Sequence, residues 1–173
     1  MLNPCRLCSA ICCKNYTITV TSFDVLRIIK NTNLKPDEFA QLIPLKILNF
    51  DNNTVLECYQ DGNCYEHILT LKSHSCYFLN DDNSCRIHEF SPLGCRLYPY
   101  QSNNKLTKNA FCPTIPKTLF RFQNPKDKAG EYLNQLDAYK KIVKEWNSKR
   151  GKKEDCLKFL LDDLNEEHIR SNI

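Results

Sequence analysis

The sequence contains little glycine, and this shortage excludes two common nucleotide-binding motifs. Only four glycines occur in the 173 residues, at Gly62, Gly94, Gly130 and Gly151. Four isolated glycines cannot form the Gly-x-Gly-x-x-Gly loop of a dinucleotide-binding protein. A phosphate-binding loop at Gly151-Lys152 is also excluded, because Trp146 occupies the position of its upstream glycine.

The sequence also lacks long hydrophobic runs and an export signal. No apolar run approaches the roughly 18 residues that a membrane-spanning helix needs. The first residues, Met1 to Pro4, lead directly into cysteines without a charged segment followed by an apolar one. An odd count of 11 cysteines without an export signal favours a reducing compartment, where clustered cysteines more often hold metal than form disulfides. We therefore expect a cytoplasmic protein that does not enter the membrane.

The cysteines are clustered in the sequence, and the densest group lies near the N-terminus. Four thiols fall within nine residues, at Cys5, Cys8, Cys12 and Cys13. A Cys-x2-Cys turn lets two sulfurs converge on one centre, as in structural zinc sites and iron–sulfur ligand runs. A disulfide knot or buried inert thiols are the alternatives. A vicinal disulfide between Cys12 and Cys13 would be strained, and neighbouring residues cannot both face one apolar core. The spacing therefore favours a metal or cluster anchor.

A second group of cysteines occurs in the turn-rich stretch from 76 to 113. Its members are Cys76, Cys85, Cys95 and Cys112. Four thiols here and four at the N-terminus make eight, which is more than a single cation usually needs. We expect the eight to converge in space and to form the ligand set of one centre or of two adjacent centres.

Basic side chains accompany these cysteines. Arg6, Lys14, Arg86 and Arg96 each directly follow one of the eight, and His88 lies three residues after Cys85. A metal bound by several thiolates carries net negative charge, which nearby cations and N–H donors offset. We expect these five side chains to surround the sulfurs rather than to bind the metal.

Three further cysteines stand apart from this set. Cys58 and Cys64 flank an Asp61-Gly62 turn and could face each other across a hairpin, as an extra ligand pair or a labile disulfide. Packing is the role that we favour for both. Cys156 lies near the start of the last expected helix, and we interpret it as structural.

Hydrophobic periodicity predicts a mixture of strands and helices. The expected strands are 16–21, 45–50, 54–59 and 64–71. The expected helices are 23–30, 36–43, about 130–149 and 157–164. The predicted class is α+β: a small, irregular, metal-stapled domain with short antiparallel strands over residues 1–115, and a helical extension over 116–173 packed on it.

The second cysteine block carries a resemblance to a known family. It reads Cys85-Arg86-Ile87-His88-Glu89-Phe90-Ser91-Pro92-Leu93-Gly94-Cys95-Arg96-Leu97-Tyr98-Pro99. With the N-terminal group, this block resembles the CxxCxxCC family of zinc- or iron-chelating domains over about residues 5–115. The chain departs from the family pattern twice: three residues separate Cys8 from Cys12 where the family usually has two, and Ser91 replaces a usual Arg.

The resemblance implies a metal cofactor held by the eight cysteines, and two functions follow from it. The first is an iron–sulfur protein, with a 4Fe-4S cluster favoured, in a redox or catalytic role. Similarity of the family to flagellin lysine N-methylases implies S-adenosylmethionine as a further cofactor and a protein as substrate, although this chain is much shorter than those enzymes. The second is a zinc-binding structural module without catalysis, whose C-terminal helices bind a protein partner. The thiol count favours the first, and whether the protein is an enzyme stays open.

A basic run at 149–153 is the feature that would suggest nucleic acid. It is short, it lacks interleaved aromatic residues, and it lies between two expected helices. A solvated linker explains it, so we expect no specific nucleic-acid binding.

Overall fold

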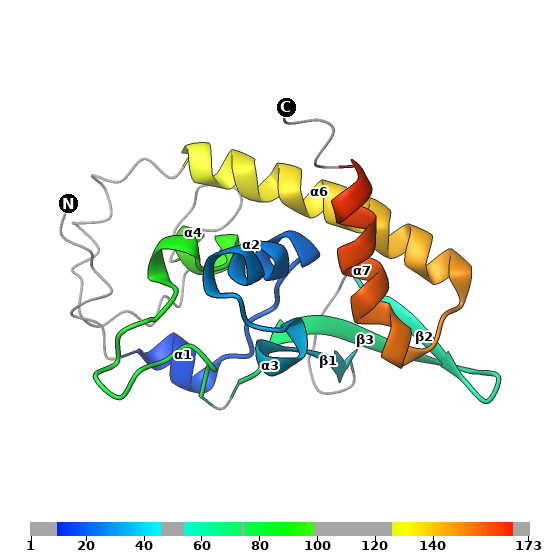
Figure 1. The fold of residues 1–173 in the computed structure, drawn as a ribbon, viewed down its shortest axis with the longest axis horizontal. Helices are drawn as coiled ribbons and strands as arrows, with labels where there is room; N and C mark the ends of the chain where they lie inside the picture. Colours follow the sequence, from blue (N-terminus) through cyan, green and yellow to red (C-terminus); the bar gives the residue numbers. More distant parts are fainter. Residues whose placement is uncertain (1–9, 46–53, 74, 99–125, 168–173) are drawn as a thin grey trace.

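The computed structural model describes residues 10–45, 54–73, 75–98 and 126–167. Within these ranges the elements in chain order are α1 (Ile11–Asn15), α2 (Ser22–Thr32), α3 (Pro36–Phe39), β1 (Ala40–Pro44), β2 (Leu56–Gln60), β3 (Asn63–Leu71), the 3₁₀ turn η3 (His88–Phe90), α4 (Leu93–Leu97), α6 (Lys126–Lys149) and α7 (Lys153–Glu167). Helix α6 runs along one side of the molecule and the sheet lies on the other (Figure 1). This mixture of a small sheet and helices confirms the α+β prediction.

Helix α2 begins and ends where its sequence provides caps. Thr21 precedes it in extended conformation, and its side chain and that of Asp24 form a reciprocal capping box. Asn33 ends the helix in the left-handed region at φ 58°, a conformation that asparagine tolerates. Val25 and Ile28 are fully buried on its inner face, so the helix predicted over 23–30 is confirmed with slightly wider bounds.

The three strands form an antiparallel sheet in the order β1-β3-β2. Asp61 and Gly62 join β2 to β3 with positive φ angles of 51° and 80°, the geometry of a two-residue type I′ turn. The strands predicted at 54–59 and 64–71 are therefore confirmed within a few residues. The stretch predicted at 45–50 lies almost entirely outside the described residues.

Two predicted elements differ from the structure. The helix expected over 36–43 ends at Phe39, because Ala40–Pro44 pairs with β3 and forms β1 instead. The strand expected over 16–21 is extended, but it pairs with β3 only at an isolated bridge between Thr19 and Thr70. Two backbone hydrogen bonds, Val20 N to Leu69 O at 3.1 Å and Leu71 N to Ile18 O at 2.9 Å, hold it beside the sheet.

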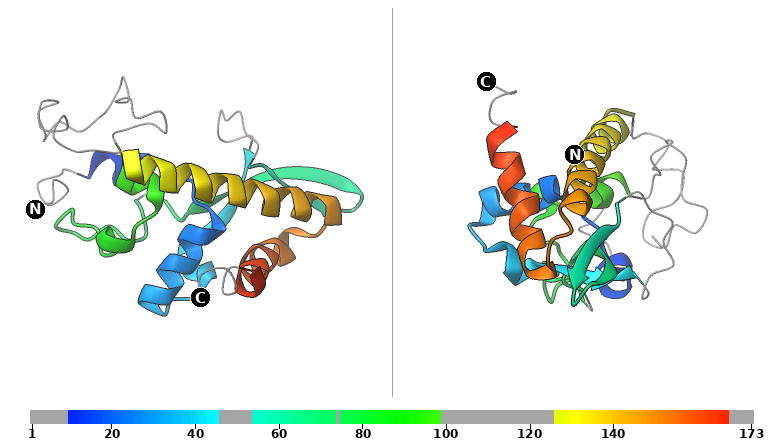
Figure 2. Two further views of the ribbon diagram at one scale, coloured as in Figure 1. Left: turned by 90° about the horizontal axis from the view of Figure 1, so that it is seen from above. Right: turned by 90° about the vertical axis from the view of Figure 1, so that its right-hand side faces the viewer.

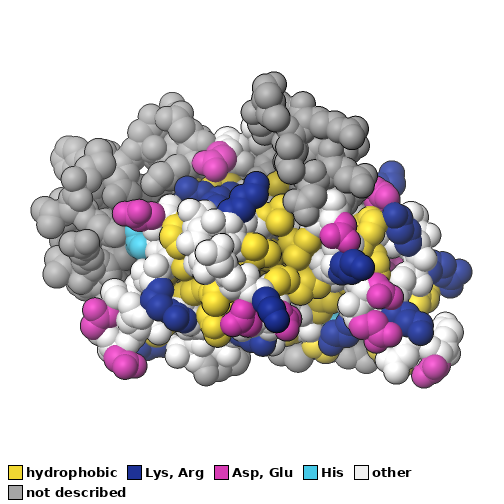
Figure 3. All heavy atoms as spheres, viewed as in Figure 1, with side chains coloured by type: hydrophobic (Ala, Val, Ile, Leu, Met, Phe, Trp, Pro, Cys, Tyr) yellow, Lys and Arg dark blue, Asp and Glu magenta, His cyan; other side chains and the backbone are white. Residues whose placement is uncertain are grey.

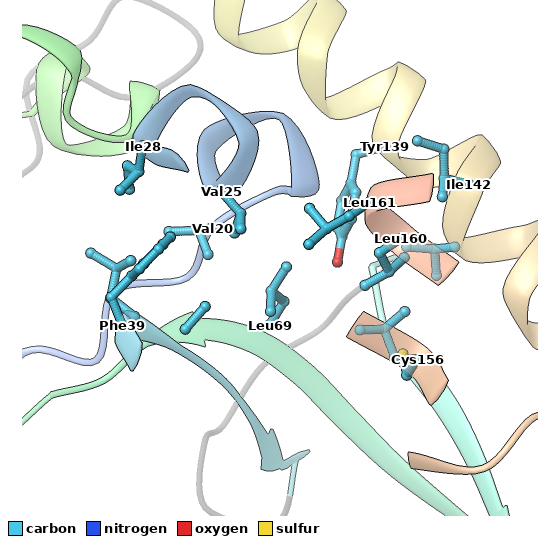
Figure 4. Packing of buried hydrophobic residues seen from close by; sticks show 14 of the residues in the cluster. Val20, Val25, Ile28, Phe39, Leu69, Tyr139, Ile142, Cys156, Leu160 and Leu161 are labelled. Carbon is cyan, nitrogen blue, oxygen red and sulfur yellow. The ribbon is translucent and has the colours of Figure 1, made fainter. Parts of the chain in front are cut away.

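The core lies between the sheet and the helices, and the C-terminal helices supply much of it. Figure 4 shows Tyr139 and Ile142 of α6 and Cys156, Leu160 and Leu161 of α7 close to residues of α2 and β3. Hydrogen bonds add to the apolar contact. Trp146 Nε1 donates to Glu57 O at 2.8 Å, and the Asn147 side chain bonds the Val55 carbonyl and the Glu57 amide, each at 2.9 Å. Helix α6 is thus fixed directly to the edge strand β2.

The surface is mixed in character. The face shown in Figure 3 carries scattered charges of both signs around a central area of apolar side chains. Phe23 and Leu26 of α2 and Leu157 of α7 are among the partly buried apolar residues packed against the core. In the described part of the chain, no helix is both long enough and apolar enough to cross a lipid bilayer.

Candidate metal centre

Three separate segments bring five cysteines into one neighbourhood. Helix α1 carries Cys12 and Cys13, the turn after β3 carries Cys76, and the segment up to α4 carries Cys85 and Cys95. Helices α1 and α4 lie at the same end of the molecule, away from the turn between β2 and β3 (Figures 1 and 2). The Cys76 amide donates to the Cys13 carbonyl at 2.8 Å, so the backbone itself joins the N-terminal group to the second group.

The adjacent thiols of α1 form an unequal pair. Their Sγ atoms are 3.9 Å apart, within hydrogen-bond range for sulfur, and both side chains are half-buried. The hydrogen bond from Cys13 lowers the pKa of Cys12, against the opposing effect of burial. The same bond, with burial and the charge of Cys12, raises the pKa of Cys13. The first proton therefore leaves the pair more easily than the second, because the remaining S–H group stabilises the thiolate beside it.

Cys76 and Cys85 lie at the two ends of a tight loop. Leu79 pairs with Cys85 in an isolated bridge, and the Leu79 amide donates to the Cys76 carbonyl at 2.9 Å. Burial raises the pKa of both thiols, and the charge of Cys12 acts in the same direction on each. The backbone hydrogen bond from Cys76 to Cys13 likewise brings this loop next to α1.

Cys95 joins the group from α4. Burial raises the pKa of its thiol well above the usual value, and the charges of Cys76, Cys12, Asp24 and Cys85 raise it further. All five thiols are therefore close enough for their charges to interact. A cation that bound them as thiolates would offset both the burial and the mutual repulsion.

Two of the predicted cations lie next to these thiols. The Arg86 guanidinium donates to the Tyr77 carbonyl, and its carbon lies 5.1 Å from the centre of the Tyr77 ring. Its charge lowers the pKa of both Cys76 and Cys85. Arg96 Nη2 lies 3.6 Å from Glu131 Oε1 of α6, and burial followed by the charge of Arg27 lowers the pKa of Arg96. Lys14 is exposed in the last turn of α1.

His88 and Ser91 close the turn that precedes α4. The His88 amide donates to the Cys85 carbonyl at 3.3 Å, and the His88 carbonyl accepts from Ser91 Oγ at 3.0 Å. Ser91 is buried, with 5% of its surface exposed. Ser91 thus stabilises this turn, at a position where a long charged side chain would have to leave the interior.

The rest of the predicted ligand set lies outside the described residues. This applies to Cys5, Cys8, Cys112 and the neighbouring Arg6. Within the described ranges, no three Cys, His, Asp or Glu side chains already stand in a metal-binding arrangement. The eight-cysteine ligand set therefore stays a prediction, to which the described residues contribute five neighbouring thiols.

The three remaining cysteines lie away from this group. The strand register pairs Cys58 with Tyr65 and Tyr59 with Cys64, so Cys58 and Cys64 are on opposite faces of the sheet. The prediction that they could face each other as a ligand pair or disulfide is wrong for this reason. Cys58 and Cys156 are both buried in the core, as expected for packing roles, whereas Cys64 is exposed. The eight described cysteines are all free thiols.

Sequence reasoning missed two charged residues beside the centre. Asp24 and Arg27 lie on α2, a helix without a cysteine, and their charges act on Cys95 and Arg96 respectively. The Thr-x-x-Asp pattern at 21–24 signals a helix cap, but nothing local connects it with α4.

The fold and the thiol group define a class of protein: a small, cysteine-rich α+β domain. The comparison with protein families makes this specific, since residues 4–113 match the CxxCxxCC family, described as "Putative zinc- or iron-chelating domain". The match covers more than half of the chain, which therefore belongs to this family. No curated protein and no solved structure gave a significant match.

Proposed function

We propose that this protein holds an iron–sulfur cluster, with 4Fe-4S favoured, through thiolates from its two cysteine groups. The observation that carries the proposal is that three segments holding five of the cysteines lie together at one end of the fold, where the Cys76 amide donates to the Cys13 carbonyl at 2.8 Å (Figure 1). Cys5, Cys8 and Cys112, outside the described residues, would complete the set of eight. When bound, such a cluster supplies one-electron transfer or a Lewis-acidic iron.

The chemistry of the donors fits this cofactor. Thiolates are soft ligands that select zinc and iron–sulfur clusters over hard cations such as magnesium. Arg86 lies beside Cys76 and Cys85, and Arg96 directly follows Cys95. Cationic and N–H donor groups near the sulfurs stabilise the negative charge of a thiolate-bound centre and tune its potential.

Zinc is the second candidate, and one feature of the fold favours it. Residues 75–98 contain little regular structure, only η3, α4 and an isolated bridge. Such a segment gains much of its order from cross-links, and a structural zinc supplies folding free energy of this kind. In that case the protein would be a binding module, and its chemistry would end at metal chelation.

Anaerobic purification with analysis of iron, acid-labile sulfide and zinc tests both candidates. We expect iron and sulfide in equal amounts, with sulfur-to-iron charge-transfer absorption, and a loss of both in Cys85→Ser and Cys95→Ser. Cys64→Ser is the matched control, because Cys64 is exposed on the hairpin and away from the thiol group. Zinc without acid-labile sulfide would refute the iron–sulfur cluster and support the zinc site instead. Equal metal content in all three variants would refute a site at these thiols.

A further inference from the structure

The short helix that carries Cys95 has no cap of its own. Pro92 occupies the N-cap position of α4 and offers no side-chain hydrogen bond. The amide of Leu93, the first residue of α4, is buried and needs an acceptor. It finds one 69 residues earlier in the chain, since Leu93 N donates to Asp24 Oδ1 of α2 at 3.0 Å.

Both carboxylate oxygens of Asp24 accept hydrogen bonds. Its Oδ2 accepts from the Thr21 amide at 3.0 Å and from Thr21 Oγ1 at 2.9 Å, and its Oδ1 also accepts from Arg27 Nη1 at 2.8 Å. Only 3% of the Asp24 side chain is exposed. A buried carboxylate costs free energy unless every oxygen is paired, and this one has four donors. One side chain therefore caps α2 and α4 together.

A second layer of hydrogen bonds fixes the direction of this carboxylate. Gln135 of α6 accepts from Arg27 Nη2 at 2.7 Å through Oε1, and its Nε2 donates to Thr21 Oγ1 at 2.5 Å. Thr21, Arg27 and Gln135 thus form a closed set of contacts around Asp24. The network connects three helices, and it meets α4 two residues before Cys95.

We propose that Asp24 is a positioning residue for the metal centre, which holds the Cys95-bearing helix in place against α2. The role rests on the proposed function, because it requires that Cys95 is a ligand. Helix α2 follows the Cys12-Cys13 segment closely in the chain, so the contact between Asp24 and Leu93 ties the two cysteine groups together from inside the protein. Partners that orient ligands in this way typically contribute a factor of about 10–100 to metal affinity.

Asp24→Asn is the sharpest perturbation. The amide has nearly the same shape, but one of its oxygens becomes an N–H₂ donor, which must face either the Thr21 donors or those of Leu93 and Arg27. Thr32→Val is the matched control: it removes the bond from Thr32 Oγ1 to the Ile28 carbonyl and weakens the last turn of the same helix, yet it leaves every contact of Asp24 intact. Both variants should unfold more easily than the wild-type protein.

The readout that separates positioning from stability is metal binding by folded protein. We would titrate each metal-free protein with zinc against a chromophoric chelator, and record the Co²⁺ ligand-field spectrum as a measure of coordination geometry. We expect Asp24→Asn to bind zinc about 10–100-fold more weakly with an altered Co²⁺ spectrum, and Thr32→Val to resemble wild type in both. If Asp24→Asn does not fold, Asp24→Glu keeps the charge, displaces the carboxylate by one methylene and should show the same loss.

Two results would overturn the proposal, and they differ in what else they refute. Unchanged zinc affinity in the folded Asp24 variants would refute the positioning role alone. Absence of any metal binding by the wild-type protein would refute the proposed function and this role with it. Amide hydrogen exchange in α4 can then still show, without metal, whether Asp24 holds that helix. Exchange should accelerate in Asp24→Asn and not in Thr32→Val.

Discussion

Replacing Gly151 by alanine should destabilise the protein, because the site has no room for a methyl group. A Cβ at this position would lie 2.3 Å from Cη2 and 2.7 Å from Cζ3 of Trp146. The indole cannot move aside easily, since its Nε1 donates to Glu57 O at 2.8 Å and its ring packs 5.4 Å from that of Phe159. Gly151 is fixed as well, because its carbonyl accepts from the Tyr59 amide at 2.9 Å.

The size of the expected loss of stability can be tested by comparing crowded Gly151 with exposed Gly130. Overpacking of this kind costs about 1–3 kcal/mol. Gly130→Ala is the matched control, because Gly130 is exposed within α6 and a Cβ there would meet nothing within 4 Å. Alanine in an exposed helix interior is more favourable than glycine by about 0.5–1 kcal/mol, so this variant should be slightly more stable than wild type.

Equilibrium unfolding in urea measures the difference directly. Far-UV circular dichroism should follow the transition, because the fluorescence of Trp146, the single tryptophan, would itself change in Gly151→Ala. With an m-value of about 2 kcal/mol per molar, the midpoint should fall by roughly 0.5–1.5 M in Gly151→Ala and rise slightly in Gly130→Ala. A midpoint in Gly151→Ala at or above that of the wild-type protein would refute the packing argument.

Two further predictions concern titratable groups of the sheet and core. Burial lowers the pKa of His67 below its usual 6.5. The imidazole therefore binds a proton more readily in the unfolded chain than in the folded protein, and the free energy of unfolding should fall as the pH drops through 6.5. The urea midpoint of the wild-type protein should therefore decline more than that of His67→Gln between about pH 7.5 and 5.5, and parallel curves would contradict this. An aromatic disulfide reagent should modify exposed Cys64 at once and buried Cys58 and Cys156 only on unfolding; equal rates in mass spectra of the labelled peptides would show that the core is open.

Local signals in the sequence predicted the elements that local contacts determine. Helix α2 could be predicted from the spacing of Phe23, Leu26 and Ile29 and from its N-cap, and the β2–β3 hairpin from Asp61-Gly62. Residues 40–43 were predicted to be helical, because no local pattern reveals that this segment pairs with β3. Long-range pairing overrides propensity there.

In the candidate site, too, local patterns were predictable from the sequence and long-range contacts were not. Cysteine spacing predicted the two thiol groups, and the structure brings five of their members together. A two-residue turn at 61–62 already implies that Cys58 and Cys64 are out of register, so their placement on opposite faces of the sheet could be predicted from the sequence. The contact between Asp24 and Leu93 joins positions 69 residues apart, and single-sequence patterns do not encode such pairs.

The docking of α6 and α7 on β2 has a consequence for where this protein can be divided. Leu56 and Cys58 of β2 are at most 2% exposed, and the core cluster that buries them includes Trp146, Cys156 and Leu160 of the two C-terminal helices. The family match ends at residue 113, before either helix begins. A fragment limited to the matched segment would present the apolar face of β2 to solvent and would invite aggregation. We therefore expect the smallest autonomous folding unit to be longer than the segment by which the family is recognised.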